Sequence, residues 1–171
     1  MQMRVDKSAL KPRSNLALAD LSGLSLNYCH LTSAVLIDAK IDGATMCWAE
    51  LGGVILTGAS AIGTNLFEAN LVCAQANHLN MSLANLCGAD LSCADLSNAV
   101  LNGVGSSGAD FQFANLTNVA MKCAELASVN FQFANLTKAD FRFANLSAAD
   151  FRSAKLDGAN FEGANLAGVR W

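Results

Sequence analysis

The residues of this chain best suited to proton transfer are five aspartates, each directly before a leucine or a phenylalanine. They are Asp90, Asp95, Asp110, Asp140 and Asp150. Paired carboxylates can serve as general acid and general base. Asparagine serves equally well at the same position elsewhere in the chain, for example at Asn85. We therefore interpret these aspartates as structural residues near a turn.

Histidine and cysteine could support nucleophilic attack or metal binding, but their spacing argues against both. His30 and His78 lie far apart in the sequence, and we interpret both as surface side chains. The six cysteines, which include no C-x-x-C pair and no zinc spacing, are Cys29, Cys47, Cys73, Cys87, Cys93 and Cys123. A phosphate-binding loop requires glycines directly before a helix, and the glycines of this chain precede no helix. We expect no enzyme activity, no catalytic residue, no cofactor and no metal site.

Composition excludes several other classes of protein. Of 171 residues, 30 are Ala, 24 are Leu and 16 are Asn, whereas charged residues make up only 15%. With 53% apolar residues the chain can bury the core of one domain and is not disordered. No stretch approaches the roughly 18 uninterrupted apolar residues of a membrane span. The net charge of −3 gives no electrostatic reason to expect nucleic-acid binding.

The N-terminal segment, residues 1–13, differs from the rest of the chain. It carries four basic residues and one acidic residue, and the only proline, Pro12, lies near its end. No apolar region of a secretory signal follows it, so we interpret it as a short helical or irregular cap. Because the cysteines show no pairing pattern, we expect free thiols in a reducing, cytoplasmic environment.

A five-residue repeat runs without interruption from Leu16 to Trp171. Stepping by five gives 32 central positions, of which 24 are Leu or Phe. Alanine stands two residues before the centre in 22 units, Asn or Asp stands one residue before it in 17, and Gly stands two residues after it in 11. The segment 84–88 shows the whole pattern, Ala-Asn-Leu-Cys-Gly. A phase held this long predicts a repeat architecture.

The period of five residues fits neither an α-helix nor a continuous β-strand. Residues two apart share one face of an extended chain, so the alanine and the central residue can both point inward if each unit turns a corner. Glycine after the centre suits a turn that requires a positive φ. We therefore predict an all-β solenoid whose successive coils are joined by hydrogen bonds.

A longer period indicates how many units make one coil. The sequence Phe-Gln-Phe-Ala-Asn-Leu-Thr occurs at residues 111–117 and again at residues 131–137, twenty residues apart. With a period of twenty, the aromatic central residues fall in two columns, one with Phe111, Phe131, Phe151 and Trp171 and the other with Phe141 and Phe161. Rings are best placed above rings. The pattern predicts four units per coil and about eight coils over residues 14–171.

The A-(D/N)-L-x-x units over residues 14–171 resemble those of the pentapeptide repeat family. The resemblance implies a right-handed quadrilateral parallel β-helix, a hand that strand twist also favours. It further implies protein binding without catalysis, since characterised relatives bind other proteins. Some of those relatives resemble B-DNA in width and charge and occupy the DNA site of type II topoisomerases.

Aromatic residues at outward turn positions are the most unusual feature of the predicted surface. Tyr28 and Trp48 stand one coil apart, as do Phe113 and Phe133, and Phe143 stands one coil after a cysteine. Binding anchors are often aromatic. We interpret these residues as a candidate surface for an unknown protein partner. The alternative interpretation is that the stacked rings only shield the edges of the coils.

Cys73 and Cys93 also stand one coil apart, which places their Cα atoms about 4.8 Å from each other and within disulfide range. We expect free thiols here too, because the ladder fixes the directions of the Cβ atoms.

The distribution of charge bears on an alternative function, a DNA-mimicking regulator or inhibitor of gyrase. Residues 14–121 carry one base and eight acids, a net charge of −7, whereas residues 122–171 carry six bases and five acids, a net charge of +1. B-DNA carries one negative charge per ~1.7 Å, so five coils would need roughly fourteen charges. The acids fall short of that number, and no long loop interrupts the repeat. We favour a non-enzymatic protein-interaction module or scaffold.

Trp171 is the last residue of the sequence and occupies a core position. The end of a solenoid exposes unpaired strands and a section of core. Three arrangements would cover it: Trp171 folds over as a lid, two copies meet end to end as a homodimer, or the chain continues in a longer protein. We favour the lid or the homodimer.

Overall fold

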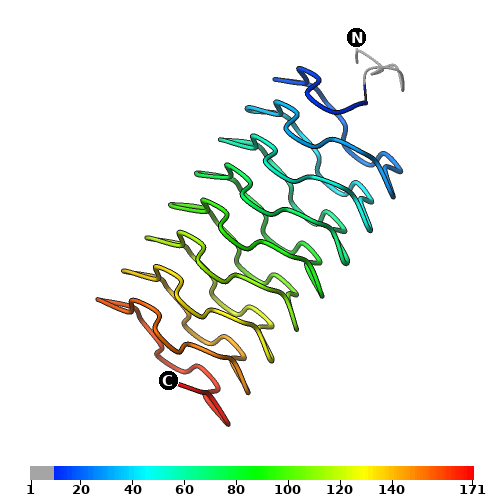
Figure 1. Ribbon diagram of the computed structural model, residues 1–171. Helices are drawn as coiled ribbons and strands as arrows, with labels where there is room; N and C mark the ends of the chain where they lie inside the picture. The colour runs from blue at the N-terminus through cyan, green and yellow to red at the C-terminus, as the bar shows by residue number, and fades with distance from the viewer. Residues whose placement is uncertain (1–9) are drawn as a thin grey trace.

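The structure, a computed structural model, describes residues 10–171, which form one straight rod with the chain winding around its axis (Figure 1). The rod is a right-handed quadrilateral parallel β-helix. Its coils are joined by parallel bridges between residues that are always 20 apart, from Asn15–Val35 to Asp150–Arg170. Four five-residue units therefore make each coil, as predicted. The expected N-terminal cap lies outside the described residues for positions 1–9.

Each strand of this helix is a single bridged residue. The bridged residue stands directly before the centre of each unit, so it recurs at every fifth position from Asn15 to Arg170. The described residues contain no helix and no strand longer than this one residue. The rest of each unit turns the corner. Parallel pairing between coils thus involves all four sides of the rod equally.

The core is made by the two inward positions of each unit. Every central side chain from Leu31 to Phe151 is at most 2% exposed, and the alanines two residues before these centres are buried with them. Small alanine fits beneath the corner, while leucine or phenylalanine fills the middle of the rod. The chain is rich in alanine and leucine because these residues occupy the two inward positions of most units.

The predicted columns of aromatic side chains exist in the C-terminal half of the core. Phe131 stacks between Phe111 and Phe151, with ring centroids 5.3 Å and 5.1 Å away. On the opposite side of the coil, Phe141 stacks on Phe161 at 5.3 Å. The two columns meet edge to face, with Phe141 lying 5.7 Å from Phe131 and 6.0 Å from Phe151. Both stacked and edge-to-face geometries are favourable for aromatic rings.

Each corner is a tight turn that contains one left-handed residue. The carbonyl of the central residue accepts a hydrogen bond from the N–H three residues later, as in Leu86 and Ala89 (2.9 Å). Every fifth residue from Arg13 to Gly168 has φ between 50° and 70°, and these are 11 glycines and 21 other residues. This is the third position of a type II turn. The predicted positive φ is confirmed, and it holds for non-glycine residues as well.

The unit 84–88 shows how the backbone N–H groups are satisfied. Four of its N–H groups donate to backbone carbonyls: two to the next coil, one to the preceding coil and one within the turn. The fifth N–H, that of Cys87, donates to Oδ1 of Asn85 at 3.1 Å. The Asn or Asp before the centre therefore completes the hydrogen bonding of the corner that follows.

The same side-chain cap recurs along the rod. All 17 Asn and Asp residues directly before a centre accept the N–H of the residue two positions later. Three other corners use an Asn or Asp side chain one coil earlier, namely Asn27, Asp42 and Asn102. Because an amide oxygen and a carboxylate oxygen both accept, Asn and Asp are interchangeable here.

Candidate interaction surface

The five aspartates singled out by their spacing all serve as turn caps. Asp90, Asp95 and Asp110 each accept the N–H two residues later at 2.9–3.0 Å. Asp140 and Asp150 do the same and also form ion pairs. The interpretation of these carboxylates as structural residues is confirmed by their hydrogen bonds.

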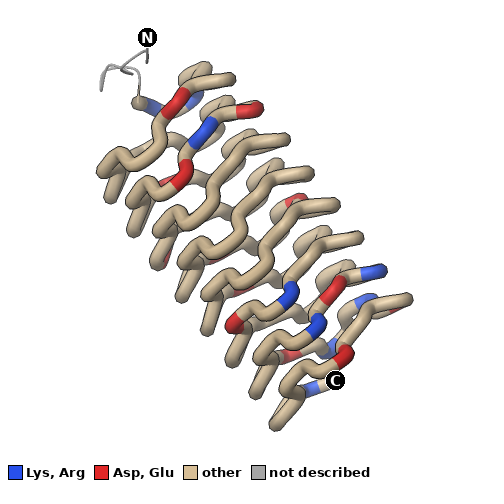
Figure 2. Tube along the Cα trace, turned by 180° about the vertical axis from the view of Figure 1, so that it is seen from behind, with Lys and Arg blue, Asp and Glu red and all other residues tan. Residues whose placement is uncertain are grey.

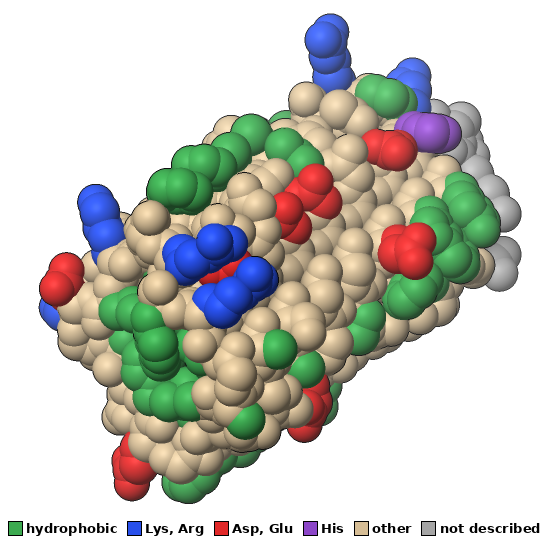
Figure 3. Space-filling model, turned by 60° about the horizontal axis from the view of Figure 1, so that its bottom comes forward, with side chains coloured by type: hydrophobic (Ala, Val, Ile, Leu, Met, Phe, Trp, Pro, Cys, Tyr) green, Lys and Arg blue, Asp and Glu red, His purple; other side chains and the backbone are tan. Residues whose placement is uncertain are grey.

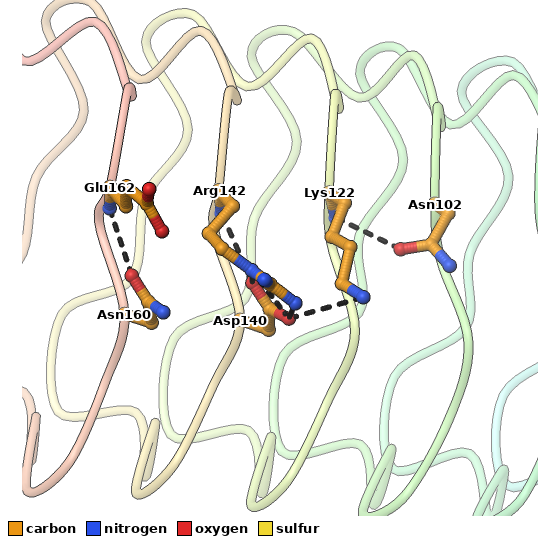
Figure 4. A network of polar contacts seen from close by, with 6 residues as sticks. All are labelled: Asn102, Lys122, Asp140, Arg142, Asn160 and Glu162. Atoms are coloured by element: carbon orange, nitrogen blue, oxygen red, sulfur yellow. Dashed lines mark hydrogen bonds and ion pairs between the residues drawn. The ribbon is translucent and has the colours of Figure 1, made fainter.

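Asp140 is the centre of a polar network on one side of the rod (Figure 4). Its carboxylate accepts from Nε of Arg142 at 2.9 Å and from Nη2 at 2.8 Å, and the Lys122 ammonium lies 3.4 Å away. The hydrogen bonds from Arg142 are the main cause that lowers the pKa of Asp140 to about 2. Lys122 in turn donates its backbone N–H to Asn102, one coil earlier. Asp140 therefore caps the turn while Arg142 and Lys122 balance the charge of its carboxylate.

Asp150 is buried, with only 2% of its surface exposed, and it is paired with two guanidinium groups. Nη2 of Arg152 lies 2.8 Å from its carboxylate and Nη2 of Arg170 lies 3.0 Å from it. The hydrogen bond from Arg152 is the main cause that lowers the pKa of Asp150. A buried carboxylate with two such partners is compensated, which gives it a structural role.

The two histidines do not form a reactive pair in residues 10–171. His30 and His78 are both exposed and belong to different columns of the rod. Among residues 10–171, no group of three or more His, Cys, Asp or Glu side chains could hold a metal ion. The six cysteines are free thiols, and burial raises the pKa of Cys29 to about 11. No helix in the described part of the chain is long and apolar enough to cross a membrane.

The first outward aromatic pair, Tyr28 and Trp48, is named the Tyr–Trp stack. Its rings lie 5.0 Å apart and within 7° of parallel. Both residues are left-handed, and their side chains are 63% and 41% exposed. Phe67 packs edge-on against Trp48 at 5.5 Å, and Nε1 of Trp48 donates to Glu68 at 2.9 Å. The stack is therefore held in place and keeps a polar edge.

The second pair, Phe113 and Phe133, is named the Phe stack. Its rings lie 4.9 Å apart and within 4° of parallel, and they are 56% and 51% exposed. The same turn column contains Cys73 and Cys93 in the two preceding coils, both exposed. The pKa of the Cys93 thiol is raised, first by desolvation and then by the neighbouring Cys73.

Phe143 stands alone at a third corner and is 62% exposed. It lies over Gly163 in the next coil, where an added Cβ would approach its Cε1 to 2.7 Å. The predicted aromatic residues therefore form three separate patches. Hydrophobic side chains gather in separate groups on the face seen in the space-filling view (Figure 3).

Two members of the first patch were missed from the sequence, Phe67 and Glu68. Glu68 stands one coil after Trp48 in the same turn column, so column sorting could have identified it. Phe67 belongs to the neighbouring corner position, and its contact with Trp48 depends on side-chain direction. Among single exposed apolar residues, Leu83 is 68% exposed and has no aromatic neighbour in its column one coil away.

Trp171 continues the core column of rings at the C-terminal end. Its ring stacks on Phe151 at 5.4 Å and meets the edge of Phe161 at 5.9 Å. The side chain remains 60% exposed.

Charged residues are sparse over the middle coils in the view from behind and gather toward the two ends (Figure 2).

Comparison with known proteins gives a consistent result. The family described as pentapeptide repeats matches in 8 copies over residues 14–53, 74–103, 107–142 and 144–170. A pentapeptide repeat protein from the thylakoid lumen of Arabidopsis thaliana is 27% identical, over 58% of this chain and 69% of that one, with a TM-score of 0.57. A trypsin-treated form of QnrB1, a plasmid-mediated fluoroquinolone resistance protein, is 17% identical over 91% of this chain and 83% of that one, with a TM-score of 0.61. The search of curated proteins returns no match.

Proposed function

Because the chain belongs to the pentapeptide repeat family, we propose that it is a non-enzymatic protein-interaction module or scaffold that binds its partner through exposed aromatic corners. The carboxylates and histidines best placed for chemistry are turn caps or surface residues, which supports a role without catalysis. The proposal rests on one observation. Five large rings occupy left-handed, solvent-facing positions at which glycine would be unstrained.

The energetics of these corners support the proposal. A non-glycine residue in the left-handed region costs roughly 1–2 kcal/mol, so a pair costs roughly twice that. Stacking of two rings contributes only about 0.5–1.5 kcal/mol. Phe143 has no ring neighbour one coil away and so lacks even this contribution. A partner that covers the rings would bury apolar surface that the rod leaves exposed.

The geometry of the stacks favours a protein partner with apolar side chains. Parallel rings held at 4.9–5.0 Å form flat, rigid surfaces that lose little side-chain entropy on binding. The Tyr–Trp stack also offers the Tyr28 hydroxyl and the carboxylate of Glu68 at its edge. Such amphipathic anchors are enriched at the centres of protein interfaces.

A capture experiment tests the proposal. The intact chain, the Trp48→Ala variant and the Phe113→Ala/Phe133→Ala variant would each be immobilised and exposed to a lysate of the organism that encodes the chain. We expect the intact chain to retain specific proteins that one or both variants lose. Truncation of a central aromatic anchor typically costs 2 kcal/mol or more, about a 30-fold loss of affinity.

Leu83→Ala is the matched control, because it removes an exposed apolar side chain from a left-handed corner without touching a stack. It should retain all captured proteins. Equal recovery of partners by the intact chain and by both aromatic variants would show that the rings only shield the coils.

A second function, mimicry of DNA toward gyrase, is supported by one feature of the surface. Glu50, Asp90 and Asp110 follow one another along a single face, and no ion pair is recorded for them in residues 10–171. Asp150, further along the same face, is neutralised by two arginines. Three charges over this length are far fewer than the one per ~1.7 Å of B-DNA. We expect the purified protein to leave gyrase supercoiling unchanged at micromolar concentration, and inhibition would favour mimicry.

A further inference from the structure

Cys73 and Cys93 occupy successive left-handed corners of one column, and both side chains are exposed. Their N–H groups donate to carbonyls of the following coil at 2.9 Å each, so the two corners are held in register. Among the described cysteines they alone stand one coil apart in one column. The two thiols therefore form a pair that the fold itself positions.

The Phe stack gives the spacing at which side chains leave this column. Phe113 and Phe133 stand one and two coils beyond Cys93, and their rings are parallel at 4.9 Å. Side chains of the column therefore project side by side at the separation of the coils. The same spacing recurs in the Tyr–Trp stack at 5.0 Å, so it is a property of the rod.

This spacing discriminates between two kinds of sulfur chemistry. A disulfide requires sulfurs about 2.05 Å apart, so both side chains would have to turn toward each other, whereas the column presents its rings in parallel at 4.9 Å. A metal–thiolate bond is about 2.3 Å long. Two such bonds in line span about 4.6 Å, close to the distance at which the column presents its side chains.

We propose that Cys73 and Cys93 form a two-coordinate site for a soft metal ion, with Cu(I) as the ion that fits best. Soft thiolate ligands select Cu(I) among the common ions. Zinc requires four ligands, and no third His, Cys, Asp or Glu in residues 10–171 completes such a set. On binding, both thiols release their protons to solvent, two sulfur–copper bonds form, and no oxidation state changes.

The surroundings of the pair favour a cation. Asp90 and Asp110, on the adjoining side of the rod, lie close enough to act electrostatically on Cys93. Their carboxylates attract a positive ion to the corner. Phe113 is the next residue of this column on the C-terminal side. This site is independent of the proposed partner surface, because the thiols can bind an ion whether or not the rings bind a protein.

Anaerobic titration of the fully reduced protein with Cu(I), in competition with the chelator bicinchoninate, tests the site. We expect one tightly held equivalent, with ultraviolet thiolate-to-copper absorption that saturates at one ion per chain. Cys73→Ser and Cys93→Ser should each weaken this equivalent by on the order of 100-fold, since disturbing even an outer partner of a ligand costs 10- to 100-fold. Circular dichroism would verify that each variant retains the β-helix.

Two controls separate the pair from free thiols in general. Cys123→Ser removes an exposed cysteine from another column and should leave the tight equivalent intact. Cys73→Ser/Ser153→Cys keeps two thiols in the same column but places them three coils apart, and it should not restore the site. The proposal is overturned if this variant binds as tightly as the intact chain. It is also overturned if the reduced protein binds no Cu(I), whether or not oxidised glutathione joins Cys73 to Cys93.

Discussion

At the scale of the residue, the Asn or Asp before each centre satisfies a donor that the backbone cannot. The N–H two residues later donates to no backbone carbonyl, and the side-chain oxygen accepts it. An amide and a carboxylate perform this task equally, so the sequence alternates between them. Where the residue before the centre offers no acceptor, an Asn or Asp of the preceding coil can accept the N–H instead, as Asn102 does for Lys122.

Asn135 provides a direct test of the cap. Its Oδ1 accepts the backbone N–H of Thr137 at 3.2 Å and the Thr137 hydroxyl at 2.7 Å. Asn135→Ala removes both hydrogen bonds and should lower the free energy of unfolding in urea by about 1–2 kcal/mol. Asn135→Asp keeps the acceptor and should lose less than half of that. Equal losses in the two variants would mean that the cap contributes nothing.

The ion pair of Asp140 predicts a defined dependence on pH. Arg142 lowers the pKa of Asp140 from 3.8 to about 2 in the folded protein. The stabilisation is therefore complete above the unfolded pKa of 3.8 and is lost as the pH falls through about 2. Asp140→Asn keeps an oxygen for the turn cap but removes the charge. Its melting temperature should lie below that of the intact chain at pH 6, and the difference should shrink toward zero near pH 2.

Arg142→Gln removes the other partner of the same pair and should show the same shrinking difference. Thermal melts recorded by circular dichroism between pH 6 and pH 2 measure both variants. A difference that stays constant across this range would show that the pair does not contribute through its charge.

At the scale of the element, each coil is shaped to receive the corner of the coil before it. Some long side chains at the left-handed position lean toward a glycine in the next coil: Leu83 is followed by Gly103, and Phe143 by Gly163. An added Cβ at Gly103 would lie 2.8 Å from a methyl group of Leu83. Glycine at these positions therefore has two roles: it adopts the positive φ without strain, and it leaves room for the side chain of the preceding coil.

Gly103→Ala and Gly108→Ala separate these two roles. Both residues have a positive φ, 64° and 69°, but nothing lies within 4 Å of an added Cβ at Gly108. Gly108→Ala should cost about 1 kcal/mol in unfolding free energy for backbone strain alone. Gly103→Ala should cost about 0.5–1.5 kcal/mol more, because Leu83 must leave its rotamer.

The double variant Leu83→Ala/Gly103→Ala is the check on this interpretation. It should cost no more, relative to Leu83→Ala, than Gly108→Ala does relative to the intact chain. Urea unfolding of the four variants measures the coupling. Identical effects of the two glycine substitutions would show that the contact with Leu83 is unimportant.

The sequence predicted the coil but not all the contacts on its surface. The repeated segments at 111–117 and 131–137 established the 20-residue register, because rings in a core must stack. The inward positions followed from the period of two in extended chain. The burial of Asp150 beneath Arg152 and Arg170, and the contact of Phe67 with Trp48, depend on how long side chains fold back over a corner. No periodicity specifies those directions.

At the scale of the whole molecule, the last coil of the 171-residue chain presents both core and unpaired backbone. The N–H groups of Leu156, Phe161 and Leu166 donate to no carbonyl within residues 10–171. Leu166 is 36% exposed and Trp171 is 60% exposed. Such an edge pairs readily with another strand edge. We propose that two copies of this chain meet through it, end to end, with Trp171 at the centre of the contact.

Sedimentation velocity over a range of protein concentrations tests this contact. The intact chain should show a sedimentation coefficient that rises with concentration toward the value of a dimer. Trp171→Glu places a charge against the apolar ring column formed with Phe151 and Phe161, and it should sediment as a monomer throughout. Trp48→Glu carries the same change on the side of the rod and should still dimerise. Dissociation by Trp48→Glu instead would move the contact to the Tyr–Trp stack, and a monomeric intact chain at every concentration would rule out the end-to-end contact.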